Sequence, residues 1–216
     1  MKKYISSVLA AALVSTLMVG CSDSNNNETV QDAGFNGVFV DRPVDGVSFA
    51  CRGVDNNPLA GVTHNGGLFG VCATGSTVSF SVGNVVLGEM EQSENNIFTP
   101  RDIAEGDDAE ANQIASLILS LSTTTVNDAG ETVLTIGPAA IAALNLEVPL
   151  AIDIETISAE TLADTIEAVV ENETTDLVQI TPEEAESHMD ETAEEILDGT
   201  ITQPEQPELP ATTGAN

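Results

Sequence analysis

The feature that most constrains the fold of this chain is a change of residue pattern near residue 99. All six phenylalanines lie before that point, in short runs where apolar and polar residues alternate. The clearest run is 77–82, in which valine and phenylalanine alternate with threonine and serine, the pattern of a half-buried strand. Beyond residue 99 the apolar residues recur at helical spacing. The sequence therefore predicts an α+β protein with strands first and helices second.

Further strand-like segments precede residue 99, and turn residues separate them. The segments are 37–41, 47–52, 68–73 and 84–88. Turn chemistry occurs at Pro43, at residues 55–58 and at Asn65-Gly66. Short strands at this spacing predict a small β-sandwich, which we place over residues 36–98.

The second half of the chain predicts several helices. Residues 110–121 carry apolar residues at i, i+3, i+4 and i+7, and further helices begin at Pro138 and after Ser158 as N-cap. The last has Thr181 as N-cap and Pro182 at its first position. It is so acidic that we expect it to dock weakly or to project. We assign residues 99–199 to an acidic α-helical region and 200–216 to a disordered tail.

Charge excludes several classes of function. The chain has 35 Asp and Glu against 5 Lys and Arg, a formal net charge of −30. Such a surface repels phosphate backbones and anionic headgroups, which argues against nucleic-acid binding and against electrostatic docking to a membrane. Only 3% of residues are aromatic and tryptophan is absent, which argues against a large aromatic-lined cofactor pocket.

The first twenty residues have the pattern of a signal peptide. Lys2 and Lys3 precede an apolar stretch, 8–19, that is too short to span a bilayer. The segment 17–21, Leu-Met-Val-Gly-Cys, resembles the lipobox of bacterial lipoproteins, although an ordinary secretory peptide with a chance cysteine is the alternative. The resemblance implies that Cys21 is diacylated, that the lipid anchors the protein to a membrane, and that Ser22 directs it to the outer membrane. Residues 21–35 are then a flexible tether.

Three segments between residues 41 and 83 resemble a known β-sandwich module. They are 41–47 (DRPVDGV), 63–69 (THNGGLF) and 75–83 (GSTVSFSVG). Their order is similar to that of the carboxypeptidase-regulatory-like, prealbumin-type repeats of bacterial surface proteins. The resemblance implies a stalk, spacer or adhesion module, although a fold does not by itself assign a function.

With Cys21 lipidated, Cys51 and Cys72 remain as an even pair in an exported protein, which predicts a disulfide. Closing a loop of about twenty residues contributes about 3 kcal/mol. A metal-binding or nucleophilic role is the alternative. A nucleophile needs a histidine base, and His64 on a turn and His188 on the acidic helix lack a recognisable catalytic context.

Other catalytic and ligand signatures are weak. There is no Gly-x-Ser-x-Gly elbow, and no lysine follows Lys3 to build a nucleotide-binding loop. We predict no enzyme activity, no catalytic residue, no metal ligand and no cofactor. Calcium is the one ligand that the composition favours, because carboxylate and amide oxygens are dense at Asp107-Asp108, 55–57 and 127–131. A solvated acidic surface is the alternative that we favour.

Taken together, these patterns predict a non-catalytic outer-membrane lipoprotein that acts as a cell-envelope or surface module for adhesion or assembly. Its partner would be another envelope protein or a surface glycan. The alternative is a periplasmic carrier or chaperone-like binder of an apolar ligand or partner segment. Whether the protein faces the periplasm or the cell surface is left open.

Overall fold

The computed structural model describes residues 34–53, 59–126, 132–172 and 177–208. All of them belong to one compact unit, Gln31–Asn216. The signal peptide and Cys21 lie outside the described residues, as does the tether up to residue 33. The unit contains both strands and helices, so the expected α+β class is confirmed. No helix in the described ranges has the length and apolar character needed to cross a membrane.

The strands form three sheets. A three-stranded sheet has the order β5-β1-β8, with β1 Phe35–Phe39, β5 Leu68–Cys72 and β8 Ile97–Phe98. A five-stranded sheet has the order β11-β7-β6-β3-β4, with β3 Ser48–Arg52, β4 Leu59–Val62, β6 Thr77–Val82, β7 Val85–Glu91 and β11 Ile152–Asp153. A small third sheet has the order β2-β10-β9, with β2 Val44–Asp45, β9 Ser122–Val126 and β10 Thr132–Ile136.

Phenylalanine side chains join the first two sheets. In β6 the alternation predicted from the sequence is present, since Val78, Phe80 and Val82 are buried and the residues between them are half-buried. The Phe80 ring lies 5.0 Å from that of Phe39 in β1 and 5.6 Å from that of Phe98 in β8. Aromatic rings from both sheets therefore build one shared apolar layer.

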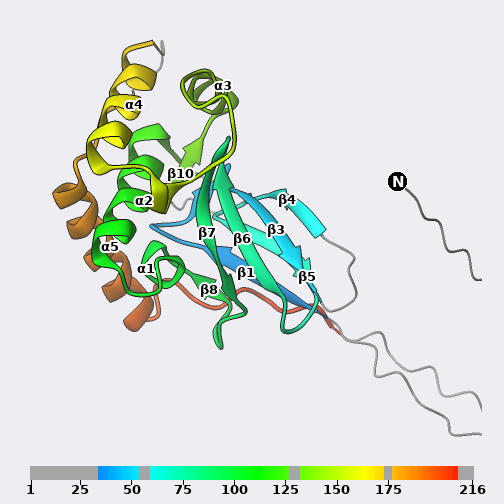
Figure 1. The fold of residues 1–216 in the computed structure, drawn as a ribbon. Coiled ribbons are helices and arrows are strands. Elements are labelled where there is room, and N and C mark those ends of the chain that lie inside the picture. The colour runs from blue at the N-terminus through cyan, green and yellow to red at the C-terminus, as the bar shows by residue number, and fades with distance from the viewer. Residues whose placement is uncertain (1–33, 54–58, 127–131, 173–176, 209–216) are drawn as a thin grey trace, which may run out of the picture. The chain divides into compact units, whose positions relative to one another are not determined.

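The helices are α1 Pro100–Ile103, α2 Asp108–Leu121, α3 Pro138–Glu147, α4 Ala159–Asn172 and α5 Pro182–Leu197, with a 3-10 turn at Ile154–Thr156. Helices α1, α2, α4 and α5 lie to one side of the β5-β1-β8 and five-stranded sheets, and β10 lies between α2 and α3 in this view (Figure 1). The predicted apolar stripe of α2 is fully buried, and α2 packs against both α4 and α5. Each helix expected from the sequence after residue 110 is present.

One hydrophobic core runs through strands and helices alike. It includes Phe80 and Leu87 from the five-stranded sheet, Leu117 from α2 and Ile166 from α4. The change of pattern at residue 99 therefore separates two kinds of element within a single core.

The first part of the predicted disordered tail, residues 200–208, lies along β1. Ile201 packs against Val38, Val40 and Ile97. The backbone of Asn36, at an irregularity in the pairing of β1 with β5, is bonded by the side-chain amide of Gln206, which accepts from its N–H at 3.1 Å and donates to its C=O at 3.1 Å. A few side chains thus order a segment whose composition favours disorder.

Candidate functional site

The predicted disulfide is present in the structure. Cys51 on β3 and Cys72 on β5 are bonded, with their Cα atoms 5.7 Å apart, and both are buried. The bond links the five-stranded sheet to the three-stranded one. In this oxidised state neither sulfur is a free thiol for metal binding or nucleophilic attack.

The two histidines have very different surroundings. His64 is exposed and forms an isolated backbone bridge with Leu68. In contrast, Nδ1 of His188 on α5 lies 3.0 Å from Oδ1 of Asp41, which is only 1% exposed. A carboxylate in this position orients the imidazole and leaves Nε2 for other contacts. This pair was missed at the sequence level, because 147 positions separate its members.

Four polar contacts, which we call the α5 clamp, hold the acidic helix against the rest of the unit. They are His188 Nδ1 to Asp41 Oδ1 at 3.0 Å, Arg42 N to Thr192 Oγ1 at 3.1 Å, Arg42 Nη2 to Glu191 Oε2 at 3.1 Å, and Arg101 Nη2 to Asp190 Oδ1 at 2.6 Å. Ala185, Met189 and Thr192 are buried beneath the helix. The helix therefore does not project. Its two arginine pairs are exposed and contribute little each, so the buried residues beneath the helix and the contact with buried Asp41 are the main features that hold it.

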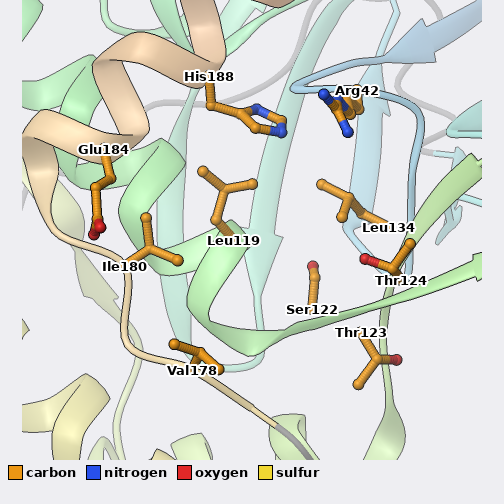
Figure 2. A pocket seen from close by; sticks show the side chains of 10 residues that line it. All are labelled: Arg42, Leu119, Ser122, Thr123, Thr124, Leu134, Val178, Ile180, Glu184 and His188. Carbon is orange, nitrogen blue, oxygen red and sulfur yellow. The ribbon is translucent and has the colours of Figure 1, made fainter.

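Beside the clamp lies a cavity of about 770 Å³, which we call the α5 pocket. Figure 2 shows the side chains around it, with His188 and Arg42 at one end and Val178 at the other. Its residues come from the turn after β1, α2, β9, β10, α5 and the segment before α5: Arg42, Leu119, Ser122, Thr123, Thr124, Leu134, Val178, Ile180, Glu184 and His188. The lining thus combines four apolar side chains with the hydroxyl residues of β9 and with Arg42, Glu184 and His188.

Serines of α2 fix the position of Ile180 in the lining. Ser116 Oγ donates to the carbonyl of Ile180 at 2.6 Å, and the N–H of Ile180 donates to Ser120 Oγ at 2.8 Å. Both serines are buried. Two hydroxyl groups four residues apart on the buried side of a helix are a sequence signal for a polar partner. That signal indicates a buried polar partner for α2, and the structure identifies the partner as Ile180.

Some polar groups at or next to the pocket lack a partner. Nε of Arg42 and Oδ2 of Asp41 are buried and form no hydrogen bond within the described residues. By contrast, Glu184 Oε2 accepts bonds from the N–H and hydroxyl of Thr181 in the capping box of α5, and Ser122 Oγ donates to the carbonyl of Ile118. Within the described residues, the pocket-lining side chains that keep a donor without a hydrogen bond include Arg42, Thr124 and His188.

The calcium candidates occupy different places. Asp107 is the N-cap of α2, and its Oδ1 accepts from the N–H groups of Ala109 and Glu110. The segments 55–57 and 127–131 lie outside the described residues. The described ranges contain no group of three or more His, Cys, Asp or Glu side chains placed to hold a metal ion.

Burial and acidic neighbours change the pKa of one carboxyl group near this cap. Burial, and then repulsion from Glu155 and Asp107, raise the pKa of Glu110 above its usual value of 4.5.

Comparison with known proteins adds no further assignment. No family model, no curated protein and no solved structure matches this chain. The candidate site is therefore defined by its geometry, in which apolar side chains lie beside a histidine and an arginine at the edge of the clamped helix.

Proposed function

We propose that the protein is an outer-membrane lipoprotein, anchored through a diacylated Cys21, that serves as a non-catalytic module for adhesion or assembly in the cell envelope. The single observation that supports this best is the buried Cys51–Cys72 disulfide. Disulfides persist in oxidising compartments outside the cytosol. The lipobox-like segment that ends at Cys21 is a second argument for export.

We also propose that residues 36–98 form a β-sandwich of the carboxypeptidase-regulatory-like, prealbumin-type class. The ring contacts between the β5-β1-β8 sheet and the five-stranded sheet support this reading. So do the strands found at 44–45 and 77–82, which lie within two of the segments that carry the resemblance, and the strand at 68–72, which begins in the third. In such modules the surface, and not a catalytic centre, contacts the partner.

The adhesion or assembly role is tested by crosslinking in intact envelopes. Whole cells that express the tagged protein are treated with a membrane-permeant crosslinker, and crosslinked species are compared with those of the Cys21→Ala variant. The proposal predicts a specific envelope protein or glycan that is captured only with the anchored form. Recovery of no specific partner from the anchored protein would contradict it.

A second candidate function is a carrier of an apolar ligand, and the α5 pocket favours it. The pocket has the volume of a small-molecule site, and its apolar lining is formed by Leu119, Leu134, Val178 and Ile180. Val178 is 64% exposed although it is apolar. A bound apolar molecule would remove this surface from water.

A neutral fluorescent naphthylamine tests the carrier role. The carrier proposal predicts saturable binding at one site per chain, and strong weakening by Val178→Asp. The matched control is Val126→Asp, because Val126 is 68% exposed and does not line the pocket. Equal effects of the two variants, or binding that does not saturate, would exclude the pocket as the site.

A further inference from the structure

The outer edge of β9 carries main-chain groups without partners. In β10, the N–H of Leu134 donates to the carbonyl of Pro43 at 2.9 Å, on the side where β2 lies and away from β9. Leu134 is paired with Thr124 in the ladder between β10 and β9. Residues of an antiparallel pair alternately face the neighbouring strand and face away from it, so the N–H and C=O of Thr124 point away from β10. None of the described residues bonds to either group.

The strand β9 also lacks the features that protect a free edge. Natural edge strands are shortened, bent by a bulge, interrupted by proline or charged. In contrast, β9 pairs with β10 over five consecutive residues without a shift of register. Its sequence, Ser-Thr-Thr-Thr-Val, contains neither proline nor a charge, and its last three residues are exposed. The strand therefore offers a regular edge to which a further strand can pair.

The α5 pocket lies against this edge, because residues 122–124 of β9 belong to its lining. Figure 2 shows Leu134 and Thr124 on one side of the pocket, Ile180 on the other and Leu119 between them. Every second side chain of a strand lies on the same face. A strand added to β9 would therefore place alternate side chains on the face of Thr124, where apolar ones can bury against the two leucines.

Charge complementarity indicates the remaining side chains of the added strand. The helix α5 borders the pocket through Glu184 and His188, and it carries seven Asp and Glu and no Lys or Arg. Asp190 and Glu191 are paired with arginines, and no salt bridge to the other five occurs within the described residues. The border of the pocket is therefore negative, which favours a partner with basic side chains.

We propose that β9 accepts an extended segment of a partner protein in which apolar residues alternate with lysine or arginine. The segment pairs with the main chain of Thr124, and its apolar side chains fill the α5 pocket. This proposal rests on the assembly function proposed above and names the kind of partner segment. A second copy of the chain is a poorer occupant, because each copy has a formal net charge of −30 and β9 itself has no basic residue.

The test uses the full chain carrying Cys21→Ala, which prevents lipidation and changes no described residue. The probe is a peptide of alternating valine and lysine, with both ends blocked and long enough to pair with all of β9. We expect one binding site by titration calorimetry. At a free peptide concentration about ten times its Kd, hydrogen exchange of the Thr124 N–H should slow about tenfold, as followed by NMR. The N–H groups of Thr123 and Thr125 face β10 and should change little.

Two variants separate the main chain of Thr124 from its side chain. Thr124→Pro removes the N–H, and a proline is tolerated at an edge position whose N–H faces away from the sheet. Thr124→Ala is the matched control, because it keeps the N–H. We expect Thr124→Pro to weaken peptide binding about tenfold, as for loss of one hydrogen bond, and Thr124→Ala to have a much smaller effect. If Thr124→Pro does not fold, hydrogen exchange in the unsubstituted chain decides.

Two further peptides test the side chains of the partner segment. Glutamate in place of lysine should weaken binding about tenfold, and added salt should reduce this difference because it screens the charges. Serine in place of valine should weaken binding at least as much, since no apolar side chain then enters the pocket.

The results separate this proposal from its alternatives. It is wrong if the lysine–valine peptide does not bind, if bound peptide leaves exchange at Thr124 unchanged, or if the glutamate or serine peptide binds equally well. If the chain alone forms a dimer that Thr124→Pro abolishes, the occupant is a second copy and the proposal is likewise wrong.

The crosslinking experiment in intact envelopes distinguishes this proposal from the assembly function. Thr124→Pro should lose the partner that the wild type captures, and Thr124→Ala should keep it. Capture of the same partner by both variants would overturn the strand pairing and leave the assembly function standing. Capture of no specific partner by the wild type would overturn the assembly function and, with it, this proposal.

Discussion

His188→Ala gives the sharpest test of how α5 is held. The Asp41 side chain is completely buried, and the His188 side chain is 19% exposed. One carboxylate oxygen of Asp41 already lacks a partner among the described residues. Removing the imidazole leaves the other oxygen unpaired as well, so a buried carboxyl group loses its hydrogen-bond partner.

The expected magnitude follows from this burial. Leaving a buried polar group without its hydrogen-bond partner destabilises proteins by about 1 to 3 kcal/mol, and a carboxyl group belongs at the upper end of that range. We therefore expect His188→Ala to lower the free energy of unfolding by about 3 kcal/mol. In the background of Asp41→Asn the same change should be much milder, since no buried carboxylate remains. The double-mutant cycle should therefore give a coupling of about 1 kcal/mol or more.

The assay is equilibrium unfolding in urea with the disulfide intact. The matched control is Arg52→Ala, which breaks an ion pair with Glu89 at 3.7 Å whose side chains are 71% and 56% exposed. An exposed pair of this kind contributes less than about 1 kcal/mol. If His188→Ala destabilises the protein no more than Arg52→Ala does, the Asp41–His188 contact does not hold α5 and the clamp is refuted.

Three further perturbations have defined outcomes. Replacing Cys51 and Cys72 together by serine should lower the free energy of unfolding by about 3 kcal/mol, measured in urea, and an unchanged midpoint would contradict the disulfide. The raised pKa of Glu110 means that the folded state holds this proton more tightly than the unfolded chain. The wild type should therefore lose stability relative to Glu110→Gln as the pH rises through the titration of this carboxyl, and the effect should exceed that of Glu167→Gln, measured by thermal unfolding against pH. Ile201→Ser should speed hydrogen exchange in β1, because this residue packs against the cluster that contains Val38 of that strand; unchanged exchange would show that the contact is not maintained.

Local patterns made much of the fold predictable. The alternation in 77–82 and the helical spacing in 110–121 each depend on neighbouring residues, so both appeared in the structure where they were expected. The Cys51–Cys72 bond was predictable because these two cysteines form an even pair in a chain that is expected to be exported. Six of the described strands, β2, β4, β8, β9, β10 and β11, were not predicted. Three of them, β2, β8 and β11, have only two residues, and β9 is mostly threonine, so neither length nor apolar alternation marks these four.

The candidate site was much less predictable. From the sequence, Asp41 belongs to a turn and His188 is an isolated histidine on an acidic helix. The folded chain brings the two side chains together. The docking of α5 was underestimated for the same reason. Its apolar stripe is thin, and the clamp residues Arg42 and Arg101 lie in distant segments of the chain. Long-range polar contacts of this kind leave no periodic pattern.

The measurement that tests the proposed anchor most directly is the mass of the mature protein purified from membranes, with and without Cys21→Ala. We predict that the wild type begins at Cys21, carries the mass of its acyl chains and fractionates with the outer membrane, and that the variant lacks this mass and is released as soluble protein. A wild-type protein without acyl mass, or a Cys21→Ala variant that stays in the membrane to the same extent, would contradict a lipid-anchored envelope protein.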